Sequence, residues 1–84
     1  MAYKIEIKSS AIKDLDLLPD KEVRKLAPRI FQLAEEPRPV GIQKLTNKEG
    51  YRIRIGNYRV LFEIDDKTES ILVFRIKHRK DAYK

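Results

Sequence analysis

The sequence predicts an α+β fold in which an N-terminal strand and a helical hairpin pack on one face of a mainly antiparallel sheet of four or five strands. Apolar residues recur at helical spacing between residues 9 and 34, and from residue 42 onward they alternate with polar residues, as in half-buried strands. Helices and strands separated along a chain in this way favour helices gathered on one face of an antiparallel sheet. The 84 residues suffice for one domain, 1–84, and are too few for two.

The N-terminal segment indicates a strand and then a first helix. Apolar and charged residues alternate over residues 3–8, which is typical of a short half-buried strand. Ser9 and Ser10 follow as candidates for a helix N-cap, and Pro19 ends the helix. The apolar stripe of this helix consists of Ile12, Leu15 and Leu18.

A second helix is predicted to begin at Asp20, which can cap it, with Glu22 in the first turn where the helix dipole favours negative charge. Its apolar stripe consists of Val23, Leu26, Ala27, Ile30, Leu33 and Ala34. Pro28 falls inside this pattern and removes a backbone hydrogen bond, so we expect a kink near Arg24 or two helical pieces. Residues 35–39 end the helix.

The second half of the chain is predicted to be strands. The segments are 42–45, 51–55, 58–64 and 71–77. Gly56-Asn57 is a two-residue hairpin turn, which fixes the pairing of the strands beside it. The resulting pairs are Ile55 with Tyr58, Arg54 with Arg59, Ile53 with Val60 and Arg52 with Leu61. Because side chains alternate across a sheet, the apolar residues should face the helices and the three arginines the open side.

The last strand begins with four apolar residues in a row, so it is predicted to be central in the sheet. We expect Leu72, Phe74 and Ile76 on its core side and Arg75 and Lys77 on the open side.

Charge is distributed unevenly along the chain. Residues 1–37 contain seven basic and seven acidic residues, whereas residues 38–84 contain twelve basic and six acidic residues, which accounts for the net charge of +6. Clustered guanidinium groups on the open sheet face predict an anion site, since arginine can donate two hydrogen bonds to one phosphate. The alternative is a solvated face whose arginines pair with Glu49, Glu63 or Asp65. Opposed like charges at Arg54 and Arg59 make this alternative less favourable.

Composition excludes several classes of site. The chain has no cysteine and one histidine, which rules out a disulfide framework, a cysteine-based zinc site and a two-histidine metal motif. There is no apolar run of about 20 residues and no signal-peptide core at the start. We therefore expect a cytoplasmic protein with neither metal nor other cofactor.

The second half of the chain resembles the RelE/ParE superfamily of bacterial and archaeal toxins. The resemblance is carried by Tyr-Arg-Ile-Arg-Ile-Gly-Asn-Tyr-Arg at residues 51–59 and by His-Arg-x-x-x-Tyr at residues 78–83. The N-terminal strand and helical hairpin also agree, so the resemblance covers essentially the whole chain. It implies a toxin neutralised by a cognate RelB-like antitoxin in a hetero-oligomer.

In the RelE branch the resemblance implies a ribosome-dependent endoribonuclease that cuts translated mRNA. The resemblance implies a site made of Arg52, Arg54, Arg59, Arg79 and Tyr83, with Arg52 binding RNA and the other four catalytic. To the catalytic residues we add His78, a candidate acid or base beside Arg79, and to the RNA-binding residues Arg75 and Lys77, which alternation places on the open side. The best-known member has lysines at the positions of Arg52 and Arg54, so the general base is left unassigned. The late catalytic position can be Lys77, His78 or Arg79.

Two of these residues have alternative interpretations. His78 has the only side chain with an ordinary pKa near neutrality, yet a lone histidine at a strand end is often a plain surface residue. Tyr83 can stack on a base or cover the sheet edge. Two other functions stay open for the whole chain: a ParE-like inhibitor of DNA gyrase, and an inactive relative that binds an antitoxin or nucleic acid.

Overall fold

Five strands form one mixed sheet in the order β1-β5-β4-β3-β2 in the computed structural model, which describes residues 2–46 and 48–80. The strands are β1 (Lys4–Ile7), β2 (Gln43–Lys44), β3 (Tyr51–Ile55), β4 (Tyr58–Asp65) and β5 (Ser70–His78), and the helices are α1 (Ser9–Asp16) and α2 (Asp20–Gln32). β1 runs parallel to β5, and the other neighbouring strands are antiparallel. The predicted α+β fold and the central position of the last strand are confirmed.

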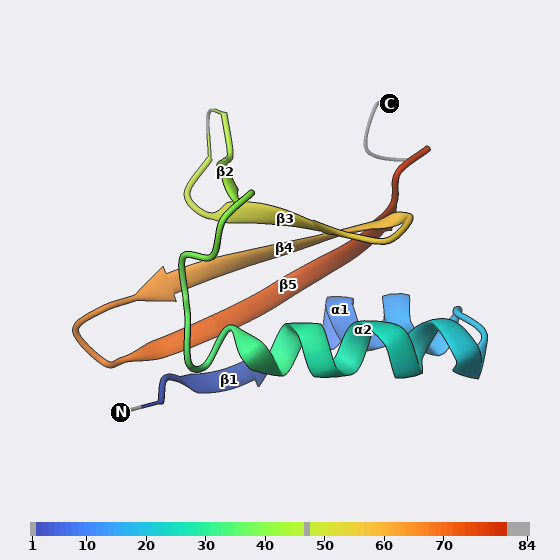
Figure 1. Ribbon diagram of the computed structural model, residues 1–84, viewed down its shortest axis with the longest axis horizontal. Helices are drawn as coiled ribbons and strands as arrows, with labels where there is room; N and C mark the ends of the chain where they lie inside the picture. Colours follow the sequence, from blue (N-terminus) through green and yellow to red (C-terminus); the bar gives the residue numbers. More distant parts are fainter. Residues whose placement is uncertain (1, 47, 81–84) are drawn as a thin grey trace.

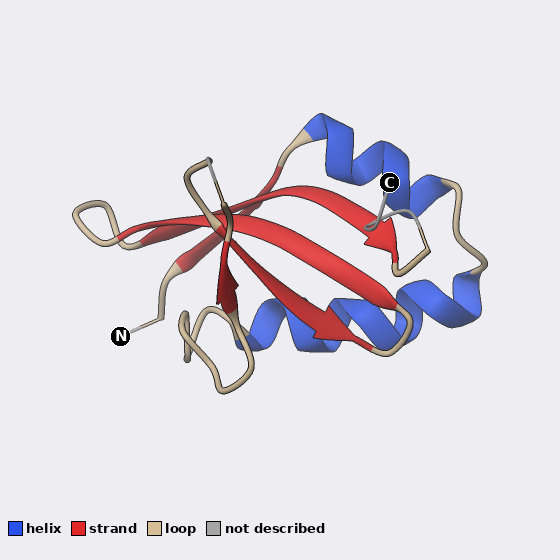
Figure 2. Ribbon diagram, turned by 90° about the horizontal axis from the view of Figure 1, so that it is seen from above, coloured by secondary structure: helices blue, strands red, loops and turns tan. Residues whose placement is uncertain are grey.

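Both helices lie on the same side of the sheet, and β2 forms the edge of the sheet beside β3 (Figure 1). Seen from above, α2 crosses beneath the strands while α1 lies alongside β5 (Figure 2). The sheet face away from the helices, called the open face below, is therefore left without a covering layer among the described residues.

The helix caps differ from the prediction. The N-cap of α1 is Lys8 and that of α2 is Pro19, and neither side chain caps its helix. Ser9 and Ser10 are the first residues inside α1, and the Ser10 hydroxyl donates to the Phe74 carbonyl at 2.7 Å. This bond between α1 and β5 uses the hydroxyl that would otherwise cap the helix.

Pro28 neither breaks nor divides α2, which is assigned as one helix through this position (Figure 1). The expectation of two helical pieces was wrong. Pro28 and Arg24, four residues before it, are both exposed. Water can therefore solvate the Arg24 carbonyl that loses its partner, which reduces the cost of an interior proline.

The core lies between the helices and the sheet. Its buried residues are Ala11, Leu26, Ile30, Leu33, Ile53, Ile55, Tyr58, Val60, Phe62, Ile71, Val73 and Ile76. A register shift between Leu61 and Phe62 makes Val73 pair with Phe62 and Arg75 pair with Leu61, so Phe74 is an extra residue in β5.

This bulge corrects the predicted faces of β5. Before it, Ile71 and Val73 face the core, and after it Ile76 does, as expected. Phe74 is instead buried outside the main core, where the Lys48 ammonium lies 5.4 Å from its ring centroid. Leu72 lines a groove on the open face. The prediction of one unbroken alternation fails for Leu72 and Phe74 because the extra residue gives the two parts of β5 opposite alternation.

A polar junction joins the N-terminus to the β4–β5 turn. The Tyr3 hydroxyl donates to Asp66 at 2.7 Å, and Arg38 donates two hydrogen bonds to the same carboxylate at 3.2 and 3.0 Å. The Arg38 guanidinium also lies 5.7 Å from the centroid of the Tyr51 ring. Hydrogen bonds from Arg38 and Tyr3 lower the pKa of Asp66, and the bond to Asp66 raises the pKa of Tyr3.

Candidate nucleic-acid interface

The β3–β4 hairpin has the register predicted from its turn. Ile55 pairs with Tyr58, Arg54 with Arg59 and Ile53 with Val60. Gly56 has a φ of +60°, a left-handed conformation that suits the first position of this tight turn. The apolar members of these pairs are buried against the helices, so the arginines occupy the open face.

A first hollow of about 230 Å³ lies beside this arginine pair, and is called the Gln43 hollow. It is lined by Gly41, Gln43, Arg52, Arg54 and Arg59. Gln43 is the register partner of Arg52, and its Oε1 accepts hydrogen bonds from Nε of Arg52 at 3.0 Å and from Nη2 at 2.6 Å. Nε of Arg54 donates to the Gly56 carbonyl at 3.3 Å.

A second hollow, of about 290 Å³, shares this arginine pair and is called the Arg79 hollow. It is lined by Arg54, Arg59, Arg79 and Lys80. The Arg79 backbone N–H donates to the Asn57 carbonyl at 2.8 Å, which ties the end of β5 to the hairpin turn. Four cationic side chains from three segments of the chain therefore surround one hollow.

Two further predicted RNA-binding residues have different positions. Lys77 is the register partner of Arg59, so it shares the open face with the arginine cluster. Arg75 is held at the junction between β5 and α1, where Asp14 accepts from its Nε at 2.9 Å and from its Nη2 at 3.5 Å. The same Asp14 carboxylate accepts the Ile76 backbone N–H at 2.8 Å. Arg75 is thus paired with a carboxylate away from both hollows.

His78 lies on the helix side of the sheet. It pairs with Tyr58 across the β4–β5 ladder, and the two rings meet edge to face with centroids 5.3 Å apart. Nδ1 of His78 accepts the Lys80 backbone N–H at 3.2 Å. Because Lys77 faces the open side, strand alternation turns His78 away from the arginine cluster. Tyr83 lies outside the described residues.

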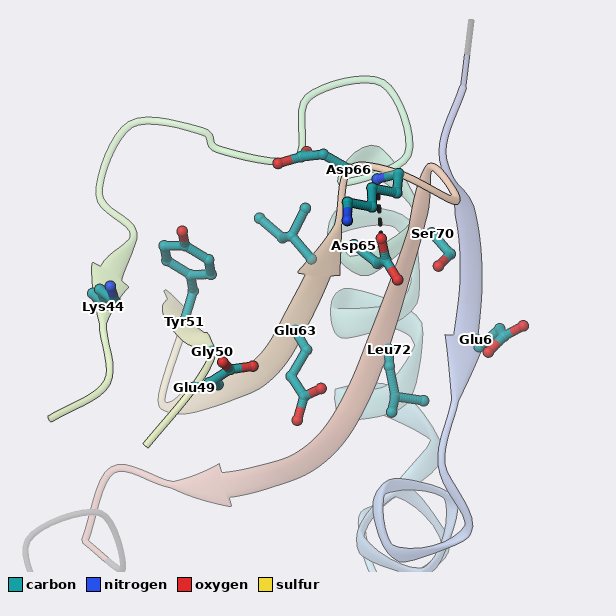
Figure 3. A pocket seen from close by; sticks show the side chains of 12 residues that line it. Glu6, Lys44, Glu49, Gly50, Tyr51, Glu63, Asp65, Asp66, Ser70 and Leu72 are labelled. Carbon is teal, nitrogen blue, oxygen red and sulfur yellow. Dashed lines mark hydrogen bonds between the residues drawn. The ribbon is translucent and has the colours of Figure 1, made fainter. Parts of the chain in front are cut away.

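The other end of the open face is acidic. A groove of about 680 Å³ is lined by Glu6, Lys44, Glu49, Gly50, Tyr51, Glu63, Ile64, Asp65, Asp66, Lys67, Ser70 and Leu72. Figure 3 shows Glu49 and Glu63 along this groove, with Leu72 and Tyr51 as apolar parts of its lining. The open face is therefore polarised, with cations near the hairpin turn and carboxylates toward the β4–β5 turn.

For Arg52 and Arg54, the alternative in which acidic neighbours neutralise the arginines is not supported. Within residues 2–46 and 48–80, no ion pair joins Arg52 or Arg54 to Glu49, Glu63 or Asp65. Asp65 instead accepts the backbone N–H groups of the β4–β5 turn.

Sequence reasoning missed Gln43, Asn57 and Lys80 as parts of this site. Gln43 could have been found from the register of Arg52 once residues 42–45 were predicted as a strand. The Asn57 contribution comes from a backbone carbonyl, and no side-chain pattern predicts that. Among the described residues no group of histidine, aspartate or glutamate side chains could hold a metal ion, and no helix there is long and apolar enough to cross a membrane.

Comparison with known proteins assigns the family. Residues 5–83 match the family model described as the ParE toxin of the type II toxin-antitoxin system parDE. The chain belongs to this toxin family. Among curated relatives, the toxin is 31% identical over 86 residues to toxin RelG of Mycobacterium tuberculosis, covering 100% of this chain and 99% of that one. It is 33% identical over 88 residues to putative toxin RelE1 of Methanocaldococcus jannaschii, covering 100% and 98%.

Solved structures agree with this assignment. The toxin is similar to a chain of the toxin-antitoxin complex RelBE2 from Mycobacterium tuberculosis, with a TM-score of 0.85 and 28% identity over 94% of this chain and 100% of that one. It is also similar to a chain of the archaeal RelE-RelB complex from Pyrococcus horikoshii, with a TM-score of 0.79 and 28% identity over 94% and 97%. Together with the curated relatives, these place it on the RelE-like side of the RelE/ParE superfamily.

Proposed function

We propose that this toxin is a metal-independent endoribonuclease that cleaves translated mRNA on the ribosome and acts in the cytoplasm. The observation that carries the proposal is the gathering of Arg54, Arg59 and Arg79 around one hollow on an open sheet face. The curated relatives named RelE and RelG support the same activity. Arginine forks are suited to holding a phosphodiester by two hydrogen bonds at once.

Cleavage without metal uses the ribose 2′-oxygen as the nucleophile. The 2′-oxygen bonds to the adjacent phosphorus as the bond to the 5′-oxygen breaks, which leaves a 2′,3′-cyclic phosphate and a 5′-hydroxyl. One proton leaves the 2′-hydroxyl and another reaches the 5′-oxygen. Arginines stabilise the negative charge that builds on the phosphate oxygens between these events.

The proton transfers need groups other than the arginines, since a guanidinium stays protonated at physiological pH. His78 faces the helix side, and the described residues that line the Arg79 hollow are all cationic. We assign charge stabilisation to this cluster and proton transfer to groups of the ribosomal complex, which gives a reason for ribosome dependence. For Tyr83 we propose the first of its two interpretations, stacking on a base, which a Tyr83→Ala variant tests against the covering of the sheet edge.

Mapping mRNA 5′ ends in ribosome-bound transcripts after tightly controlled expression tests the proposal. The expected result is cuts within codons for the wild type and none for Arg54→Gln. The ParE description of the matching family model favours one second candidate, inhibition of DNA gyrase. That function would give a DNA-damage response without cuts. Absence of any growth defect would identify an inactive relative and overturn both.

An antitoxin partner forms part of the proposal. The similar structures include RelB-RelE complexes, and this toxin exposes several large apolar side chains, of which Ile12 lies in α1 and Phe31 in α2. The exposed apolar residues are Ile12, Leu17, Phe31 and Val40. We infer that a RelB-like antitoxin forms a hetero-oligomer with the toxin and covers part of this apolar surface.

A further inference from the structure

The contact between Gln43 and Arg52 joins a neutral acceptor to a charged donor. One neutral oxygen, Oε1 of Gln43, accepts from both Nε and Nη2 of Arg52. This fixes the plane of the guanidinium and occupies two of its five N–H groups, so that three stay available. A carboxylate at position 43 would make the same contacts but would cancel the charge of Arg52. Glutamine holds the arginine in place and leaves its charge uncancelled.

The two hollows share Arg54 and Arg59 but differ in charge. The Arg79 hollow adds two cations to the shared pair, Arg79 and Lys80, whereas the Gln43 hollow adds one cation and the neutral amide. A phosphate undergoing cleavage gains negative charge in the transition state, and the more cationic hollow suits it. A neighbouring phosphate keeps its single negative charge throughout the reaction. It therefore needs less positive charge around it, as in the Gln43 hollow.

We propose that the Gln43 hollow is a second phosphate subsite, which binds a phosphate of the mRNA adjacent to the one cleaved in the Arg79 hollow. Gln43 is the positioning residue of this subsite, because it orients Arg52 without neutralising it. This inference rests on the proposed RNA cleavage and deepens it by assigning two consecutive phosphates of one strand to two hollows.

The test combines a protein change with removal of one phosphate charge. Programmed ribosomes receive mRNA with a methylphosphonate at the linkage 5′ or 3′ to the cleaved one. In the wild type, one of these two substitutions should slow cleavage about tenfold, because a charge-assisted hydrogen bond is lost. In Gln43→Glu, cleavage of unmodified mRNA should be slowed to a similar extent, and the same methylphosphonate should add no further loss.

Two other variants separate charge from orientation. Gln43→Met keeps the charge of Arg52 but removes its acceptor, so a smaller loss of about threefold is expected from the freed side chain. Gln32→Glu, which adds the same charge on the exposed side of α2, is the matched control and should cleave like the wild type. Equal methylphosphonate penalties in the wild type and in Gln43→Glu would overturn the subsite, as would wild-type cleavage by Gln43→Glu.

A second measurement does not depend on cleavage. In ¹⁵N spectra of the free toxin, the Arg52 Nε signal should shift on titration with a 2′-O-methyl RNA trinucleotide, and the shift should shrink in Gln43→Met. An unchanged Arg52 signal in both proteins removes the positioning role. If Arg54→Gln abolishes cleavage while Arg52→Gln leaves it intact, the subsite fails and the proposed function stands. If the wild type cuts no mRNA, the proposed function fails, and the titration still decides the subsite.

Discussion

Arg54 and Arg59 face each other across the hairpin, at a cost to folding. Like charges directly opposite in a sheet destabilise it by up to about 1 kcal/mol. Arg54→Gln should therefore leave the free energy of unfolding unchanged or slightly higher and abolish mRNA cleavage, while Arg54→Lys should rescue cleavage in part because an ammonium lacks the two-pronged contact. Chemical denaturation paired with a cleavage assay measures both. An Arg54→Gln variant that unfolds, or that folds and still cuts at the wild-type rate, contradicts the phosphate assignment.

Gly50 is a second single-residue constraint, of a structural kind. Its φ is +120°, and a Cβ there would lie 2.9 Å from the Phe62 carbonyl oxygen. Gly50→Ala should lower the free energy of unfolding by about 2–3 kcal/mol, from backbone strain and the steric clash together. Gly41→Ala is the matched control, since Gly41 also has a positive φ, +96°, but nothing lies within 4 Å of the added atom. Equal losses in the two variants would show that strain alone accounts for the effect.

At the scale of elements, Asp14 joins α1 to β5 through two different partners. Its side chain is 17% exposed, and that of Arg75 is 45% exposed, so the ion pair is partly screened by water. Asp14→Asn can still accept the Ile76 N–H and should cost no more than about 1 kcal/mol. Asp14→Ala leaves that part-buried N–H without an acceptor and should cost about 1–3 kcal/mol. Urea denaturation tests whether Asp14→Ala loses more stability than Asp14→Asn, with Arg75→Gln as the control that removes only the ion pair. If Asp14→Asn loses more, the ion pair with Arg75 is what stabilises this junction.

The same elements show which features the sequence can predict. A two-residue turn allows only one register, so the face of Arg54 and Arg59 followed from Gly56-Asn57 alone. The extra residue at Phe74 leaves no local signal, because an apolar run looks the same with or without a bulge. Continuing the alternation from Lys77 to the next residue would have placed His78 on the helix side, so its position was available from the strand pattern.

Longer-range contacts were not available in this way. Asp14 meets Arg75 across 61 residues of sequence, and a pattern of alternating residues says nothing about such a pair. Arg79 lies beside the hairpin because its backbone N–H donates a hydrogen bond to the Asn57 carbonyl. A contact between backbone groups cannot be predicted from the identity of the side chains. Sequence periodicity therefore predicts which face a residue occupies, and tertiary contacts decide which residues of that face meet.

For the whole molecule, the junction of Tyr3, Arg38 and Asp66 links folding stability to pH. The pKa of Asp66 is lowered in the folded state, so its contribution is present above the unfolded pKa and is lost as pH falls through the folded value. The pKa of Tyr3 is raised, so its contribution is present below its unfolded pKa and is lost as pH rises through the folded value. Asp66→Asn should therefore reduce the loss of folding stability that the wild type shows as the pH falls into the acid range. An unchanged acid limb of the stability–pH curve in Asp66→Asn would remove this junction from the acid response.

The exposed apolar side chains and the arginine cluster predict separable effects on toxicity and on its neutralisation. Leu17 is 85% exposed and Val40 is 99% exposed, so replacing either with serine removes little buried surface from the free toxin and should hardly change its stability. If the antitoxin covers these side chains, loss of an apolar anchor should weaken the complex by about tenfold or more. Leu17→Ser should then stay toxic while the co-expressed antitoxin restores growth less well.

Arg54→Gln should give the opposite pair of results, with no toxicity and unaltered binding of the antitoxin, because Arg54 lies on the open face. Titration calorimetry with the purified antitoxin measures both variants. Wild-type affinity in both Leu17→Ser and Val40→Ser would show that the antitoxin anchors on neither side chain.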